Sequence, residues 1–195
     1  MYTLARRVVG PIYRLLFRIR VTGRENIPLD GGVILCANHT AYSDVVVLGM
    51  ISPRDLSFVA KEELFKGKFL NRLFTSLGAI PINREKPSMD TFKRIVKILK
   101  EGNALAIFMQ GGRRKKGEEM DTEDYKAGVA LFAIKGQVPV VPINIKSTFK
   151  PFSKIHINIG EAISFEEHWG QKMRAEDFDK AAGKVMDAIA ALGGS

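Results

Sequence analysis

The sequence predicts one α/β domain, built from a mostly parallel sheet with helices on its faces. Short apolar runs alternate along the chain with longer segments of helical periodicity, a pattern typical of strand and helix units in this fold class. The length of 195 residues suits a single domain with a sizeable core. We also expect some antiparallel pairing near the C-terminus.

Residues 1–20 predict a basic amphipathic helix ahead of the main domain, which we place at residues 21–195. The segment holds five arginines and no acid, interleaved with apolar residues. This composition is typical of a helix that lies in a membrane interface, and we expect a bend at Gly10-Pro11. The structural alternative is a helix packed on the domain with its arginines in water. Because arginines interrupt the apolar residues throughout, we expect neither a membrane-spanning helix nor a signal peptide.

The other elements follow from apolar runs and from the residues that begin or end helices. Strands are predicted at residues 19–22, 33–37, 56–60, 79–83, 104–109, 138–143 and 155–159. Helices are predicted at residues 43–51, 65–77, 89–100, 122–135 and 173–192. Ser88 is expected to cap the third of these helices, and Gly102 to end it. The helix at 65–77 is a second basic amphipathic segment, for which core packing and membrane contact both remain open.

The strand at residues 138–143 carries Pro139 and Pro142. Because proline cannot donate a backbone hydrogen bond, we do not expect this strand to be fully paired in the middle of the sheet. We expect it to border the functional site instead.

The segment from Val33 to Asp44 carries the main candidate site. His39 follows a buried run, at the end of a strand where open α/β sheets bind their ligands. On one continuous helix, five residues would separate Asp44 from His39 by about 140°, so the pair requires a turn. We expect Asp44, in the first turn of the next helix, to accept the imidazole N–H and leave the other nitrogen as a general base. The alternative is a loop histidine beside an aspartate that merely favours a helix N-terminus.

Two further strand ends suit an anion, namely Arg84 and Gly111-Gly112-Arg113. Glycines let backbone amides approach an anion closely, and arginine binds phosphate with two parallel hydrogen bonds. The net charge of +9 and the pI near 9.7 also indicate an acidic partner. Together these features suggest a lipid phosphate bearing a hydroxyl that His39 deprotonates, although each separately is also typical of an ordinary surface turn.

On these residues the sequence resembles the glycerolipid acyltransferase family. Its first motif, Asn-His-x-x-x-x-Asp, is matched by Asn38, His39 and Asp44, and its Ala-Lys-x-Glu-Leu element by residues 60–64. Its second motif, a glycine and an apolar run ending in arginine, corresponds to residues 78–84. Its fourth motif, rich in proline, corresponds to residues 138–143. The third motif departs from the family's Phe-Pro-Glu-Gly-Thr-Arg, because residues 108–113 place glutamine at 110 and glycine at 112.

The resemblance implies a fold like that of glycerol-3-phosphate acyltransferase and the reaction that goes with it. His39 would take the proton of the sn-2 hydroxyl of a lysophosphatidic acid, Asp44 would orient His39, and the product would be phosphatidic acid. The co-substrate would be an acyl thioester of coenzyme A or of acyl carrier protein, without a cofactor or a metal. The residues expected to bind the acceptor or shape its pocket are Lys61, Arg84, Gln110, Gly111, Gly112 and Arg113. Pro139 and Pro142 would line the acyl groove or be structural.

The loss of a carboxylate at Gln110 keeps two alternatives open, another lysophospholipid acceptor or a catalytically weakened lipid-binding homologue. The expected partners are an anionic membrane surface and, as one donor, acyl carrier protein. The expected location is the cytoplasmic face of the cell membrane, with peripheral or monotopic attachment. We expect no nucleic-acid partner, because the basic run at residues 113–116 is short and no recognised motif accompanies it.

Two other chemistries are less consistent with the sequence. A hydrolase with Ser43 or Cys36 as nucleophile would be expected to show a G-x-S-x-G elbow, and the apolar neighbours of Cys36 do nothing to lower a thiol pKa. The three histidines, His39, His156 and His168, follow no metal-ligand spacing. A single cysteine also excludes an internal disulfide and favours a reducing compartment.

Overall fold

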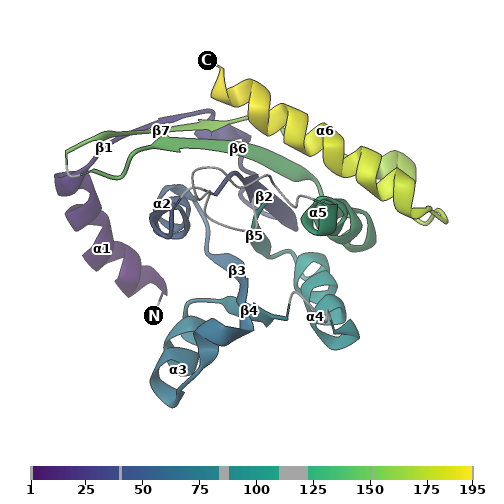
Figure 1. Cartoon of the computed structure of the whole chain (residues 1–195), viewed down its shortest axis with the longest axis horizontal. Helices are drawn as coiled ribbons and strands as arrows, with labels where there is room; N and C mark the ends of the chain where they lie inside the picture. The colour runs from purple at the N-terminus through teal and green to yellow at the C-terminus, as the bar shows by residue number, and fades with distance from the viewer. Residues whose placement is uncertain (1, 40, 84–87, 110–122, 151, 195) are drawn as a thin grey trace.

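A seven-stranded sheet forms the centre of the computed structural model, which describes residues 2–39, 41–83, 88–109, 123–150 and 152–194 (Figure 1). The strand order is β1-β7-β6-β2-β5-β3-β4, and every neighbouring pair is parallel except β6 with β7. The strands are β1 Arg18–Thr22, β2 Val33–Ala37, β3 Leu56–Lys61, β4 Ala79–Ile82, β5 Ala104–Phe108, β6 Val140–Ser147 and β7 Lys154–Ile159. This sheet confirms the predicted fold class, including the antiparallel pairing near the C-terminus.

Helices cover both faces of the sheet. They are α1 Tyr2–Leu16, α2 Ser43–Ile51, α3 Lys68–Ser76, α4 Met89–Lys100, α5 Glu123–Gly136 and α6 Ala175–Gly193, with single turns η1 Arg24–Asn26, η2 Glu62–Phe65 and η3 Glu166–His168. In Figure 1, α1 and α2 lie on one side of the sheet, α4, α5 and α6 lie on the other, and α3 sits beside the edge strand β4. Within the described ranges, no helix combines the length and apolar character that crossing a membrane requires.

The central strand β2 is apolar on both faces. Val33, Leu35 and Ala37 pack in one cluster with the buried side of α2, whereas Ile34 and Cys36 pack in a second cluster beneath α4, α5 and α6. All five residues are buried, which explains why the sequence shows a continuous apolar run there and no alternation. Packing on both faces holds the carboxyl end of β2 rigidly, and His39 follows that end.

The predicted helix at residues 1–20 is too long, since α1 ends at Leu16 and residues 18–22 form β1. Arg18 and Arg20 alternate with Ile19 and Val21, which pack against the core, and β1 pairs with β7 along its whole length. A period of two fits a strand, so the sheet takes these residues from the helix. The predicted helix at 65–77 is also shorter, because η2 occupies residues 62–65 and α3 begins at Lys68.

The expectation of incomplete pairing for the proline-bearing strand is confirmed, because β6 lies between β2 and β7 but residues 140–142 take no part in the ladder with β7. Pro139 precedes the strand, and the ladder with β7 begins one residue after Pro142, at Ile143. The Pro142 carbonyl accepts a hydrogen bond from Gly160 N at 2.9 Å, so its ring nitrogen faces the end of β7 as well. Pro142 therefore deletes one bond at the end of a ladder, which a central strand tolerates.

Candidate active site

The candidate site forms at the carboxyl ends of β2 and β5, next to each other in the sheet. From β2 the chain continues through α2 on one face, and from β5 it continues through α5 on the opposite face. Such a switch point is where open α/β sheets bind their ligands. The fold therefore places the residues after β2 in a position suited to chemistry.

His39 and Asp44 form the pair that the sequence predicts. His39 Nδ1 lies 3.1 Å from Asp44 Oδ2, with the histidine side chain 18% exposed and the aspartate side chain fully buried. Because a carboxylate only accepts hydrogen bonds, the contact places a proton on Nδ1. In the neutral ring Nε2 is then the nitrogen without a proton, and the partly exposed ring can present it to a substrate hydroxyl.

Besides its contact with His39, Asp44 makes two hydrogen bonds with the backbone of Ala41. Its Oδ2 also accepts a hydrogen bond from Ala41 N at 2.8 Å, and its own N donates to Ala41 O at 3.0 Å. It stands in the first turn of α2, where the helix dipole favours a negative charge. The hydrogen bond from Ala41 N therefore fixes the carboxylate that orients His39.

Asn38 and Phe108 support His39, and the sequence reasoning assigned neither of them a role in positioning it. The Asn38 side chain donates to Ile145 O at 2.9 Å and accepts from Ile145 N at 2.7 Å, which ties the end of β2 to β6. The Phe108 ring, at the end of β5, lies 4.7 Å from the His39 ring between centroids, at 41°. In the sequence, only the motif match of Asn38 and the strand-terminal position of Phe108 could have indicated these supporting roles.

Lys61 is the last residue of β3 and lies at the same end of the parallel strands as His39. The register aligns Phe58 with Ala106 and Ala106 with Leu35, so three residues further on Lys61 lies level with Asn38, two strands across. Two strand spacings correspond to roughly 10 Å. Lys61 is exposed, and an extended lysine side chain can therefore reach toward a ligand of His39.

The remaining predicted binding residues divide into two groups. Arg84 and the third-motif residues Gln110, Gly111, Gly112 and Arg113 lie outside the residues that the structure describes. Pro142 pairs with Cys36 in the register and is buried, while Pro139 precedes Val140, which pairs with Ile34 near the opposite end of β2 from His39. These positions favour the structural alternative for the two prolines.

The structure does not support Cys36 or Ser43 as a nucleophile, and the other two histidines lie in other elements. Cys36 is fully buried, and burial raises the pKa of its thiol far above the usual range, so it stays protonated. The Ser43 hydroxyl accepts a hydrogen bond from Tyr13 of α1 at 3.4 Å. His156 lies in β7 and His168 in η3, and the described part of the chain contains no cluster of His, Cys, Asp or Glu able to hold a metal ion.

Comparisons with known proteins agree with this geometry. Residues 18–146 match the family model described as Acyltransferase. The chain is 31% identical over 170 residues to the 1-acyl-sn-glycerol-3-phosphate acyltransferase of Bacillus subtilis (strain 168), a match covering 84% of this chain and 82% of that protein. A relative of the same name from Borreliella burgdorferi is 29% identical over 77% of this chain, which spans 60% of that relative's length.

The fold is also similar to a solved structure, the 1-acyl-sn-glycerophosphate (LPA) acyltransferase of Thermotoga maritima. The TM-score is 0.74 at 22% sequence identity, and the match covers 100% of this chain and 80% of that one. The segment matched by the family model includes the whole of β2 and α2, and therefore His39 and Asp44.

Proposed function

This chain belongs to the acyltransferase family, and we propose that it transfers a fatty acyl group from an acyl thioester to the sn-2 hydroxyl of 1-acyl-sn-glycerol 3-phosphate, forming phosphatidic acid. The observation that carries the proposal is the contact between His39 and the buried Asp44 at the end of β2. The names of the bacterial relatives support the acceptor, and the basic character of the chain suits its phosphate.

The reaction needs one proton carrier. His39 Nε2 accepts the proton of the sn-2 hydroxyl as the oxygen attacks the thioester carbonyl, and Asp44 stabilises the imidazolium that forms. The tetrahedral intermediate collapses with cleavage of the C–S bond, and the departing thiolate takes the proton back from His39. The acceptor attacks the bound thioester directly, so the chemistry requires no covalent enzyme intermediate, no metal and no cofactor.

The acceptor phosphate needs cations near His39, at the carboxyl ends of the strands. Lys61 lies level with Asn38 there, and the family resemblance adds Arg84 and Arg113, with Gln110, Gly111 and Gly112 shaping the pocket. Donors near the carbonyl must also stabilise the oxyanion, a contribution often worth about 3 to 4 kcal/mol. Coenzyme A and acyl carrier protein are both suitable thioester carriers.

We place the enzyme at the membrane surface, on the cytoplasmic face, by peripheral or monotopic attachment. On α1 the apolar side chains of Ile12 and Leu15 are exposed beside Arg14, and on α3 Phe69 is 77% exposed beside Arg72. No residue of α3 is buried, which supports membrane contact over core packing for this helix. Exposed apolar groups among cations suit the interface of an anionic leaflet, and the cytoplasmic leaflet carries that charge.

The test is thiol release from acyl-coenzyme A and from acyl carrier protein, with and without lysophosphatidic acid. We expect acceptor-dependent release with at least one donor, loss of that release in His39→Ala, and full release in the control His168→Ala. His168 lies in η3, away from the site, so the control removes an imidazole without changing the dyad of His39 and Asp44. Release that persists in His39→Ala would refute the assignment of the base.

Gln110 motivates the second candidate, a lipid-binding homologue with weakened catalysis. Where the family has a glutamate, this chain has an uncharged side chain of the same shape. If lysophosphatidic acid elicits no thiol release, Gln110→Glu separates two cases. Restored release would identify a silenced site, whereas release with another lysophospholipid and the wild-type chain would identify a different acceptor.

A further inference from the structure

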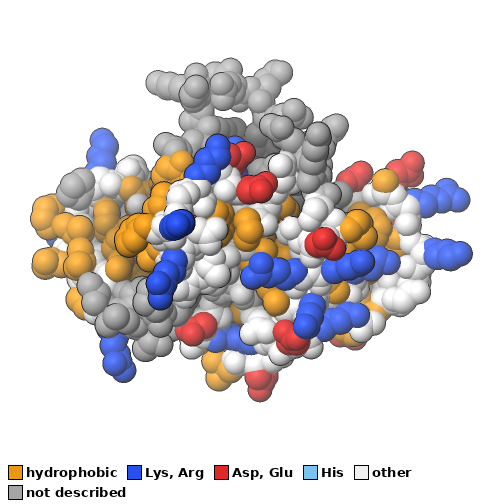
Figure 2. Space-filling model, turned by 90° about the horizontal axis from the view of Figure 1, so that it is seen from below, with side chains coloured by type: hydrophobic (Ala, Val, Ile, Leu, Met, Phe, Trp, Pro, Cys, Tyr) orange, Lys and Arg blue, Asp and Glu red, His pale blue; other side chains and the backbone are white. Residues whose placement is uncertain are grey.

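The helix α1 presents two different faces. On its outer face Ile12 and Leu15 are exposed, and Figure 2 shows apolar side chains gathered at the α1 end of the molecule. Gly10, Tyr13 and Phe17 recur at intervals of three and four residues and therefore share the inner face. Gly10 is buried, and the two rings are partly buried against the apolar cluster that contains the buried side of α2. The inner face of α1 therefore packs beside α2.

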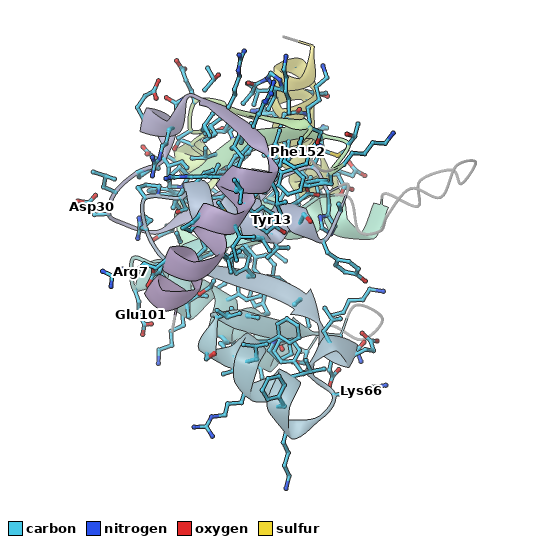
Figure 3. All side chains as sticks on the ribbon, turned by 90° about the vertical axis from the view of Figure 1, so that its left-hand side faces the viewer. Arg7, Tyr13, Asp30, Lys66, Glu101 and Phe152 are labelled. Carbon is cyan, nitrogen blue, oxygen red and sulfur yellow. The ribbon has the colours of Figure 1, made fainter. Side chains whose placement is uncertain are left out.

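Contacts at the end of α1 hold the Tyr13 ring in place. Its centroid lies 5.4 Å from that of Phe17, and the Phe17 ring lies 6.0 Å from Phe149 in an edge-to-face arrangement at 81°. Phe149 belongs to the loop between β6 and β7, and Phe152 of the same loop donates its N–H to Leu16 O at 2.6 Å. Figure 3 shows Tyr13 on the C-terminal half of α1 and Phe152 beside the end of that helix. The position of Tyr13 is therefore fixed relative to the sheet.

The Tyr13 hydroxyl reaches the start of α2. It donates a hydrogen bond to Ser43 Oγ at 3.4 Å, and Ser43 is the first residue of α2. Tyr42 occupies the N-cap position of that helix, where a shorter side chain such as Ser, Thr, Asp or Asn is preferred because it can cap the helix. Contacts from other elements, such as the one with Tyr13, therefore help to fix the first turn of α2.

Ser43 is covalently next to Asp44, the carboxylate that orients His39. The distance from Asp44 Oδ2 to His39 Nδ1 is 3.1 Å, near the long end of the range for N–H···O hydrogen bonds. A small outward shift of the first turn of α2 would therefore weaken this contact. Because the Asp44 side chain is fully buried, it moves with its backbone. The hydrogen bond from Tyr13 opposes such a shift.

Packing alone does not account for the hydroxyl group of Tyr13. The contacts of its ring with Phe17 and with the apolar cluster are ones that a phenylalanine would make equally well. A hydroxyl that is partly removed from water costs free energy unless it forms a hydrogen bond. Ser43 provides that bond, so the polar part of Tyr13 is directed at the turn that carries Asp44.

We propose that Tyr13 is a positioning residue for acyl transfer, because its hydroxyl fixes the first turn of α2, in which Asp44 orients His39. Tyr13 acts through Ser43 and Asp44 and does not take part in the proton transfer itself. The inference rests on the proposed function in that the dyad of His39 and Asp44 is the base for acyl transfer. It makes the inner face of α1 a part of the catalytic structure, in addition to the interfacial role proposed for the outer face.

The first test measures kcat and KM for thiol release with detergent-solubilised lysophosphatidic acid in Tyr13→Phe. This variant keeps the ring and its contact with Phe17 and removes the hydroxyl. Because 3.4 Å is long for an O–H···O bond, we expect kcat to fall by about two- to fivefold, the lower end of what one hydrogen bond supplies, with KM unchanged. The control Thr75→Val removes a hydroxyl bond of similar length, 3.3 Å to Asn71 on α3, and should keep the wild-type kcat. An equal loss in the control, or an unchanged kcat in Tyr13→Phe, would overturn the proposal.

Two double variants separate positioning from a general effect on folding. Tyr13→Phe/Ser43→Ala should lose no more activity than the weaker of its two single variants, because both substitutions remove the same bond. Tyr13→Phe should also have little further effect on kcat in Asp44→Asn, where the charge that Tyr13 helps to position is absent. Urea unfolding confirms that each variant is folded. Losses that multiply in either double variant would refute action through Ser43 and Asp44.

A measurement that needs no substrate separates this proposal from the proposed function. In protein with isotope-labelled histidine, the Nδ1 proton that faces Asp44 should give an N–H signal that is absent from His39→Ala. We expect Tyr13→Phe to shift this signal and to speed its exchange with water, while Thr75→Val leaves it unchanged. If the wild type releases no thiol but the signal responds to Tyr13→Phe, the positioning role stands and the proposed function fails. A signal that is identical in Tyr13→Phe and the wild type would overturn the positioning role, whatever the activity.

Discussion

Replacement of Asp44 by asparagine tests the dyad most directly. The substitution keeps the shape of the side chain and removes the charge that faces His39 Nδ1 at 3.1 Å. Asparagine can still accept from Ala41 N through its single oxygen, so the turn between β2 and α2 retains a bond. The imidazolium that forms in the transition state, however, loses its counter-charge.

The magnitude follows from two estimates. A hydrogen bond to a charged group is worth about 1.5 to 3 kcal/mol, and unit charges about 4 Å apart interact by about 4 kcal/mol at an effective dielectric constant near 20. The fully buried Asp44 and the 18% exposed His39 put this pair toward the upper part of that range. At about 1.4 kcal/mol for each factor of ten, kcat should fall by about 10²- to 10³-fold. KM should change much less, because the charge forms only as the proton moves.

The assay is steady-state thiol release with lysophosphatidic acid as acceptor, combined with urea unfolding of each variant. The matched control is Asp90→Asn, which removes an exposed aspartate from the first turn of α4. Both variants lose a favourable helix-dipole interaction of about 0.3 to 1 kcal/mol, so the control accounts for that part of any loss of stability. A folded Asp44→Asn protein with the wild-type kcat, or a control with an equal loss of kcat, would refute the role of Asp44.

Four further substitutions test the surroundings of the site and the fold. Cys36→Ser should lower the free energy of unfolding by about 1 to 3 kcal/mol, because it buries a hydroxyl, but should leave kcat of the folded enzyme unchanged. Because burial raises the pKa of the Cys36 thiol, the native protein should resist thiol alkylation at pH 8 and react only in denaturant. Phe108→Leu should lower kcat up to about tenfold through loss of the ring contact with His39, and an unchanged kcat would remove Phe108 from the site. Gly23→Ala should destabilise the fold strongly, because Gly23 has a φ of +75° and a Cβ there would lie 2.1 Å from a backbone oxygen of β7. Gly183→Ala in α6 meets open space and should stabilise the fold by about 0.8 to 1 kcal/mol in the same urea titrations.

The dyad was predictable because its information is local. The apolar run of β2, the five-residue offset and the N-terminal position of Asp44 in α2 are all contained in residues 33–51. By contrast, the bond from Asn38 to Ile145 joins residues 107 positions apart, and the tilted ring contact of His39 with Phe108 joins the ends of two strands. Such partners depend on the strand order, which local periodicity does not specify.

The boundary error at the end of α1 and the incomplete pairing of β6 have different physical causes. At the end of α1, residues 17–22 carry both helical and alternating patterns, and residues 18–22 form a strand because they pair with β7. For β6, the prediction treated both prolines as lost donors. Pro139 precedes the strand, and the missing donor of Pro142 falls at the end of the neighbouring ladder, a position that only the register of β7 reveals.

The pairing of β1 with β7 has a consequence for biosynthesis. Among the described strands β1 pairs with β7 alone, and β7 is the last strand along the chain. At a synthesis rate of about 5 to 20 residues per second, the partner of β1 emerges from the ribosome on the order of 10 s after β1 itself. During that interval the basic amphipathic segment at residues 1–22 has no sheet edge to join. Under the membrane attachment proposed above, this undocked segment would be available to lipid headgroups before the sheet is complete.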